Sequence, residues 1–138
     1  MVSSISIDAQ PNLNIDSVLL NGIQNNFRRA NARIIVSLPS LADAGSAFTI
    51  VIRYHAPGSG SSPIGGGLLF TRHGPDFVPV MATHSEPFGA PLWWPCVDNP
   101  ADKATAEIAA KSRLKTRYDG IILDRFRICV VGGRNRRS

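Results

Sequence analysis

The side chains with the clearest capacity for chemistry gather in residues 82–108. Within that stretch His84 and Glu86 are two positions apart, so on a strand they would share a face. A His–carboxylate pair of this kind could transfer protons to and from a substrate, or could be ordinary polar surface. Both interpretations of His84 and Glu86 stay open on the spacing alone.

A second pair of carboxylates follows closely. Asp98 and Asp102 are four positions apart with Pro100 between them, and Lys103 comes directly after. Paired carboxylates can act as general acid and base. A turn with a proline in it favours a structural role, in which Asp98 and Asp102 accept backbone hydrogen bonds and anchor Lys103.

Between these two pairs lie Trp93, Trp94, Pro95 and Cys96. Two adjacent indoles could form a stacking platform for a ligand, but each indole gains most by burying about 150–250 Å², which favours packing on a core. Cys96 has neither a base nor a cationic cluster beside it, so we expect an inert buried thiol. A metal site is not expected, because the chain's histidines and its second cysteine, Cys129, show no ligand spacing.

The core of this stretch reads Trp-Trp-Pro-Cys-Val-Asp-Asn-Pro-Ala-Asp-Lys-Ala-Thr over residues 93–105. It resembles the signature of the N-terminal β-domain in the aminopeptidase N family of zinc metallopeptidases (gluzincins), and a looser similarity runs from about Leu13 to Gly120. The positions that carry this structural signature are Trp93, Trp94, Pro95, Cys96, Asp98, Pro100, Asp102 and Lys103.

The resemblance implies a specific role for Glu86. In that family the segment before the signature reaches the active site of a neighbouring catalytic domain, and a Gln or Glu there binds the free α-amino group of the peptide. The family's zinc-binding His-Glu-x-x-His does not occur in these 138 residues. We therefore expect a truncated, non-catalytic β-domain without a cofactor, which borders the substrate entrance of a separate catalytic domain where zinc would bind.

Length and composition agree with one domain. A chain of 138 residues, 43% hydrophobic and 18% charged, can form one modest core and is not typical of disorder. No apolar run approaches the roughly 20 residues of a membrane helix, and no signal-peptide pattern opens the chain. The expectation is a soluble protein that does not contact a membrane.

The hydrophobic pattern predicts an all-β fold, a mostly antiparallel β-sandwich that is incomplete at its ends. Residues 103–111 alternate small apolar and polar side chains, and helix competes with strand there because Ala favours helices. Asn21-Gly22 and Asp119-Gly120 are hairpin signals. Pro39 is expected to close a strand, and residues 41–45 are expected to form a connector. The predicted strands cover residues 3–8, 14–20, 32–38, 47–54, 68–71, 77–82 and 103–111, the second hairpin signal joins residues 113–118 to residues 121–123, and residues 126–131 could pair as a further strand.

After Leu123 the sequence no longer follows the pattern of the family that it resembles, so we expect a β-sandwich domain over residues 1–124 and a basic C-terminal strand or tail over residues 125–138. The basic region itself begins earlier, at Lys111. The alternative function is a stand-alone β-sandwich that binds peptide or carbohydrate through Trp93 and Trp94, or nucleic acid through the basic region. A basic end is more typical of a solvated tail, so we do not expect nucleic-acid binding. Unpaired strand edges predict a homo-oligomer.

Overall fold

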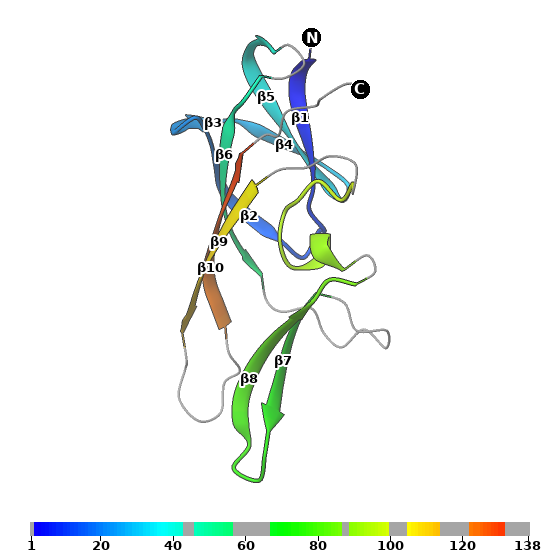
Figure 1. Ribbon diagram of the computed structural model, residues 1–138, viewed down its shortest axis with the longest axis vertical. Helices are drawn as coiled ribbons and strands as arrows, with labels where there is room; N and C mark the ends of the chain where they lie inside the picture. The colour runs from blue at the N-terminus through cyan, green and yellow to red at the C-terminus, as the bar shows by residue number, and fades with distance from the viewer. Residues whose placement is uncertain are drawn as a thin grey trace.

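The computed structural model of the chain describes residues 2–42, 46–56, 67–86, 89–99, 105–113 and 122–131 (Figure 1). Strands dominate these ranges, and no helix within them is long and apolar enough to span a membrane. The elements in chain order are β1 (Val2–Asp8), β2 (Asn14–Leu20), β3 (Ile23–Asn25), β4 (Phe27–Ala30), β5 (Arg33–Ala42), β6 (Thr49–Ala56), β7 (Gly67–His73), β8 (Val78–His84), the 3-10 helix η1 (Ala90–Leu92), β9 (Thr105–Arg113) and β10 (Ile122–Val131).

Two antiparallel sheets enclose the hydrophobic core. The three-stranded sheet has the order β1-β5-β4, and the five-stranded sheet has the order β3-β2-β6-β10-β9. Because side chains alternate along a strand, each sheet sends every second residue inward: Ile34 and Val36 of β5 are fully buried, and Ile50 and Ile52 of β6 are at most 1% exposed. Burial of each such side chain contributes about 1.5–3 kcal/mol. The predicted all-β, mostly antiparallel sandwich is confirmed.

The hairpin signal at Asn21-Gly22 is also confirmed. Both residues have positive φ, 49° and 82°, and they join β2 to β3 with Leu20 opposite Ile23. A Cβ at Gly22 would meet nothing within 4 Å, so the backbone conformation and not a lack of space favours glycine there.

The expected end of β5 at Pro39 is wrong, because the strand continues to Ala42. Its pairing with β1 is irregular at this point: Ser4 lies opposite Ser37, but Val2 lies opposite Ala42. Pro39 falls within that irregularity, where a missing N–H costs no ladder hydrogen bond. The connector predicted from Leu41 onward therefore begins later than expected, and residues 43–45 lie outside the described ranges.

The β7–β8 hairpin projects from one end of the sandwich (Figure 1). Its two strands form a separate sheet, so Pro79 lies on an edge strand, as its missing N–H requires. Leu68, near the start of β7, is fully buried and belongs to the core cluster. At the other end the predicted turn lies between His73 and Val78, the paired residues that flank the tip.

Residues 105–113 form the edge strand β9, so the strand prediction is confirmed over helix. β10 pairs with β6 on one side and β9 on the other, and it continues across Asp124 and Arg125, where the domain boundary was expected. The register with β9 is irregular between Leu123 and Arg125. The predicted Asp119-Gly120 turn and the chain after Val131 lie outside the described residues.

Candidate functional site

The tryptophan segment, residues 89–99, begins with the one-turn helix η1. Pro91 suits this position because its fixed φ is already helical and its missing N–H is not needed in the first turn. The N–H groups of Trp93 and Trp94 both donate to the carbonyl of the first helical residue, at 3.1 Å. This turn places the two indole rings beside each other, with centroids 5.9 Å apart and planes tilted by 45°.

The β1–β2 connection holds η1 in place. The N–H of Gln10 donates to the carbonyl oxygen of Pro91 at 3.1 Å, and Nδ2 of Asn12 donates to the carbonyl oxygen of Leu92 at 2.8 Å. Both carbonyls belong to the last turn of a helix, where no intrahelical donor is available. A loop some 80 positions earlier in the chain therefore completes the hydrogen bonding of η1.

Asp8, the last residue of β1, fixes the other end of the tryptophan segment. Its N–H and carbonyl pair with Cys96 at 2.8 and 3.0 Å, and its Oδ2 accepts the N–H of Asp98 at 3.2 Å. Its Oδ1 accepts Nε of Arg33 at 2.8 Å. Cys96 thus forms a single antiparallel β-bridge with the last residue of β1, at the end of the three-stranded sheet.

The indoles of Trp93 and Trp94 are half-buried and pack against the core cluster. The Tyr54 hydroxyl, inside that core, donates to the carbonyl oxygen of Trp93 at 2.7 Å. Burial raises the pKa of Tyr54, with a smaller contribution from Cys96, so the phenol stays a donor. Nε1 of Trp93 donates to Oγ of Ser85 at 3.0 Å. The two rings therefore brace the segment against the sandwich.

Cys96 is a free thiol, 5% exposed. Burial raises its pKa to about 12, and the charges of Asp98 and Asp8 add to the effect. Because the thiolate is the nucleophilic form, this environment suppresses reactivity. The position of Cys96 agrees with the expectation of an inert buried thiol.

The carboxylates of the signature are placed differently from the expectation. Asp98 is exposed, and the hydrogen bond at this position runs from its backbone N–H to the carboxylate of Asp8. Sequence reasoning gave Asp98 the acceptor role that Asp8 fills. Pro100, Asp102 and Lys103 lie outside the described residues.

Glu86 is exposed and lies in a turn beyond the end of β8. β8 ends at His84, so the idea that the two residues share a strand face is wrong. Ser85, between them, is held twice: its carbonyl accepts the N–H of Gly89 at 2.7 Å, and its hydroxyl accepts Nε1 of Trp93. The Glu86 carboxylate therefore follows directly on an anchored residue and faces solvent.

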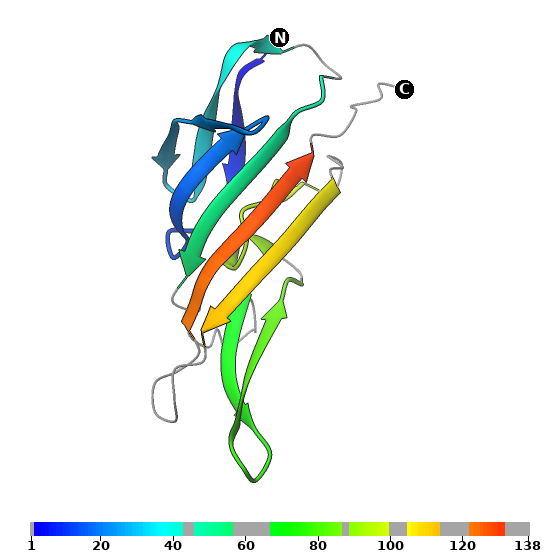
Figure 2. The same ribbon diagram turned by 90° about the vertical axis from the view of Figure 1, so that its left-hand side faces the viewer.

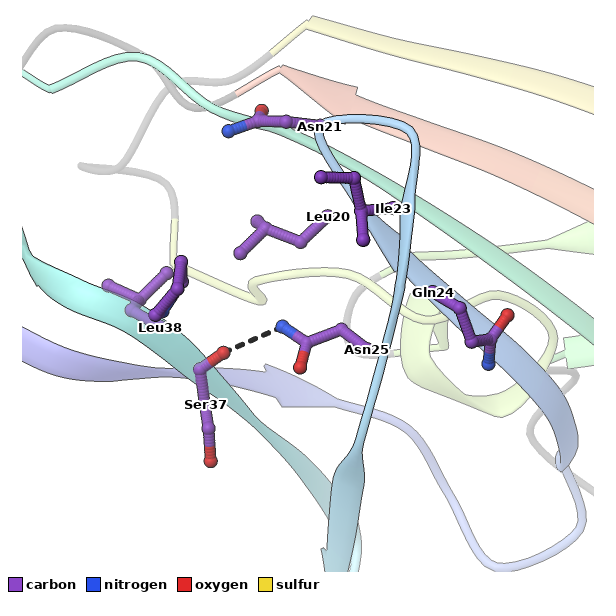
Figure 3. Close-up of a pocket in the computed structure, with 8 residues that line it drawn as sticks. Leu20, Asn21, Ile23, Gln24, Asn25, Ser37 and Leu38 are labelled. Atoms are coloured by element: carbon purple, nitrogen blue, oxygen red, sulfur yellow. Dashed lines mark hydrogen bonds between the residues drawn. The ribbon is translucent and has the colours of Figure 1, made fainter.

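A separate pocket of about 290 Å³ lies between the β2–β3 hairpin and β5 (Figure 3). Asn25 crosses it, donating from Nδ2 to the carbonyl oxygen of Ser37 at 2.7 Å, and Oδ1 of Asn21 already accepts the N–H of Thr49. None of its lining residues is titratable, so it offers no acid–base chemistry. They are Leu20, Asn21, Ile23, Gln24, Asn25, Ser37, Leu38 and Pro39. Across the described part of the chain, no group of three or more His, Cys, Asp or Glu side chains could hold a metal ion.

Three residues that support the tryptophan segment escaped sequence reasoning. Asp8 and Tyr54 contact it from strands far away in the sequence, and Arg29 donates to the carbonyls of Ala9, Gln10 and Leu13, which shapes the loop that holds η1. A strand was predicted over residues 47–54, but the hydrogen bond of the Tyr54 hydroxyl was not. The spacing of residues contains no signal for these contacts.

Comparison with protein-family models found no matching model for this chain. Comparisons with curated proteins and with solved structures also found no match. The similarity of residues 93–105 to the aminopeptidase signature therefore stays a prediction.

Proposed function

We propose that this chain is a non-catalytic β-domain of a zinc aminopeptidase-like protein, in which the sandwich supports the tryptophan segment and Glu86 receives the α-amino group of a peptide. The observation that carries the proposal is the exposed Glu86 directly after Ser85, which is anchored through both its carbonyl and its hydroxyl. The catalytic domain and its zinc would come from outside these 138 residues.

The chemistry of the position supports this role. A carboxylate accepts hydrogen bonds from an ammonium group more strongly than a neutral acceptor does, because both partners are charged. An anchored neighbour reduces the freedom that Glu86 loses on binding, so more of the interaction energy appears as affinity. In water the interaction would be weak, and a second domain that excludes solvent would strengthen it.

The packing of the indoles favours this role over a ligand platform. Trp93 and Trp94 lie against the core, and Trp93 uses its main-chain carbonyl and its indole N–H within the protein. A stacking platform for carbohydrate or peptide needs open ring faces. The described contacts therefore favour a supporting role for the two indoles.

A graft tests the proposal: this chain replaces the N-terminal β-domain of a zinc aminopeptidase, and hydrolysis of leucine p-nitroanilide is measured. Glu86→Gln should lower kcat/KM roughly 10- to 100-fold, mainly through KM, because one charge-assisted hydrogen bond is lost. Glu107→Gln, at another exposed carboxylate, is the matched control and should leave both constants unchanged.

Three results would count against the proposal. The first is a folded graft that hydrolyses no substrate, and the second is a graft in which Glu86→Gln behaves like Glu107→Gln. The third comes from the chain by itself: leucinamide should shift the NMR signals of Ser85 and Glu86 and N-acetyl-leucinamide should not, so equal responses to the two compounds would oppose amine recognition.

A further inference from the structure

β9 is the outermost strand of the five-stranded sheet (Figure 2). It pairs with β10 along one side, and among the described residues nothing pairs with its other side. All five of its residues whose exposure is described, 105–109, are exposed, and Ile108 is 39% exposed. An unpaired edge of nine residues presents a row of free N–H and C=O groups, which is a template for another strand.

The inner face of the sheet continues onto this open strand. Ile52 of β6 lies opposite Ile128 of β10, which in turn lies opposite Ile108 of β9. Opposite residues in antiparallel strands share a face, so Ile108 is on the face that Ile52 buries in the core. An apolar row therefore runs out to the edge and stops there partly exposed.

The charges of β9 are arranged so that opposite charges would face each other if the strand paired antiparallel with a second copy of itself. Ala109 is the fifth of the nine residues Thr105–Arg113, and Glu107 and Lys111 are placed symmetrically about it. A two-fold axis perpendicular to a sheet pairs each strand with an antiparallel copy of itself, and it lies midway between the two copies of one residue, which face each other. With the axis at Ala109, Glu107 of each copy lies opposite Lys111 of the other.

We infer that β9 pairs antiparallel with β9 of a second copy of this chain, with Ala109 on the two-fold axis, so that two five-stranded sheets join into one. This register uses all nine residues of both strands and forms two cross-strand pairs of opposite charge. It also puts Ile108 opposite Ala110 of the second copy, which covers the exposed end of the apolar row. Nothing in this pairing depends on Glu86 or on a catalytic domain.

Neighbouring registers satisfy fewer of these conditions. An axis at Glu107 or Lys111 puts like charges opposite each other, which destabilises a strand pair. An axis at Ile108 leaves Glu107 opposite Ala109, without a charged partner. An axis at Ala110 pairs Glu107 with Arg113 but leaves two residues of each strand without a partner.

Charge reversal tests the inference on the whole chain by analytical ultracentrifugation. Glu107→Lys and Lys111→Glu should each raise the dimer dissociation constant by at least roughly tenfold, because each converts both attractive pairs into repulsive ones. An equimolar mixture of the two variants should dimerise again, since every 107–111 pair is then of opposite charge. Glu86→Lys, at an exposed carboxylate outside β9, is the control and should dimerise like the parent.

A cross-link tests the register. In a Cys129→Ser background the remaining native thiol, Cys96, is buried. Ala109→Cys should then form a disulfide-linked dimer under mild oxidation, because residues opposite across the axis have Cα atoms about 4.5–5.5 Å apart. Thr105→Cys, four residues from the axis, should form at least roughly tenfold less disulfide-linked dimer, because the two introduced thiols would lie about eight residues apart along the strands.

Three results would overturn the inference. The first is a parent chain that stays monomeric at several hundred micromolar. The second is dimerisation that Glu107→Lys does not weaken or that mixing the two variants does not restore. The third is cross-linking of Ala109→Cys no faster than that of Thr105→Cys.

Discussion

The two ends of the row Ile52–Ile128–Ile108 show the same residue type in contrasting surroundings. Ile52 is fully buried beneath the three-stranded sheet, whereas Ile108 on the same face is 39% exposed. In Figure 2 the strands of the three-stranded sheet lie behind the β2 side of the five-stranded sheet, and β9 lies at the opposite edge. The extent of the second sheet, and not the hydrophobicity of the strand, decides which residues form the core.

The largest expected difference in unfolding free energy is between alanine substitutions of the two isoleucines at the ends of that row. Ile52→Ala should lower the free energy of unfolding by about 2–5 kcal/mol, because it leaves a cavity in packed surroundings. Ile108→Ala should cost about 1 kcal/mol or less, because its site is partly solvated. Urea titrations at concentrations where the chain is monomeric measure both; equal losses would contradict the difference in burial.

A smaller difference in unfolding free energy is expected between two hydrogen bonds that hold Trp93, one over the core from Tyr54 and one exposed to Ser85. Tyr54→Phe removes the donor to the Trp93 carbonyl and should cost about 1–2 kcal/mol, since the acceptor lies over the core. Ser85→Ala removes the exposed acceptor of the Trp93 indole N–H and should cost less than about 0.5 kcal/mol, because water replaces it. Denaturation followed by tryptophan fluorescence compares them, and a reversed order would oppose the assignment.

The smallest expected effect is the contribution of the Cys96 thiol to the pH dependence of the unfolding free energy. Its folded pKa, raised to about 12, exceeds the value of about 8.5 expected in the unfolded chain. The resulting stabilisation is fully present below the unfolded pKa and is lost as pH rises toward the folded pKa. The parent should therefore lose more stability between pH 8 and pH 11 than Cys96→Ala does.

Tyr54 also has a raised pKa and likewise lowers stability as pH rises. Because Tyr54 is present in both proteins, the difference between their pH profiles reports on the Cys96 thiol. Unfolding titrations across this pH range supply the measurement. Parallel pH profiles for the two proteins would show that Cys96 ionises equally easily in the folded and unfolded chain.

The period-two pattern was sufficient to predict the strands that reach the core. β6 is such a case, since its alternating apolar residues are buried as expected. β3 and β4 were not predicted, because Gln24 and Asn25, and then Arg28 and Arg29, give no alternation; pairing with a longer neighbouring strand makes them extended.

The candidate site was only partly predictable. The composition of the tryptophan segment indicated a packed loop, and Trp93, Trp94 and Cys96 lie accordingly. The turn at Glu86 and the acceptor role of Asp8 depend on where distant strands end, which local spacing does not encode.

The bridge between Asp8 and Cys96 joins residues 88 positions apart. A contact so distant along the chain carries a large loop-closure cost and tends to form slowly. During synthesis, the end of β1 emerges long before the residues that complete it, so its N–H and carbonyl must remain with water or with temporary partners. β1 can pair with β5 much earlier, but its last residue is among the last to acquire its final neighbours.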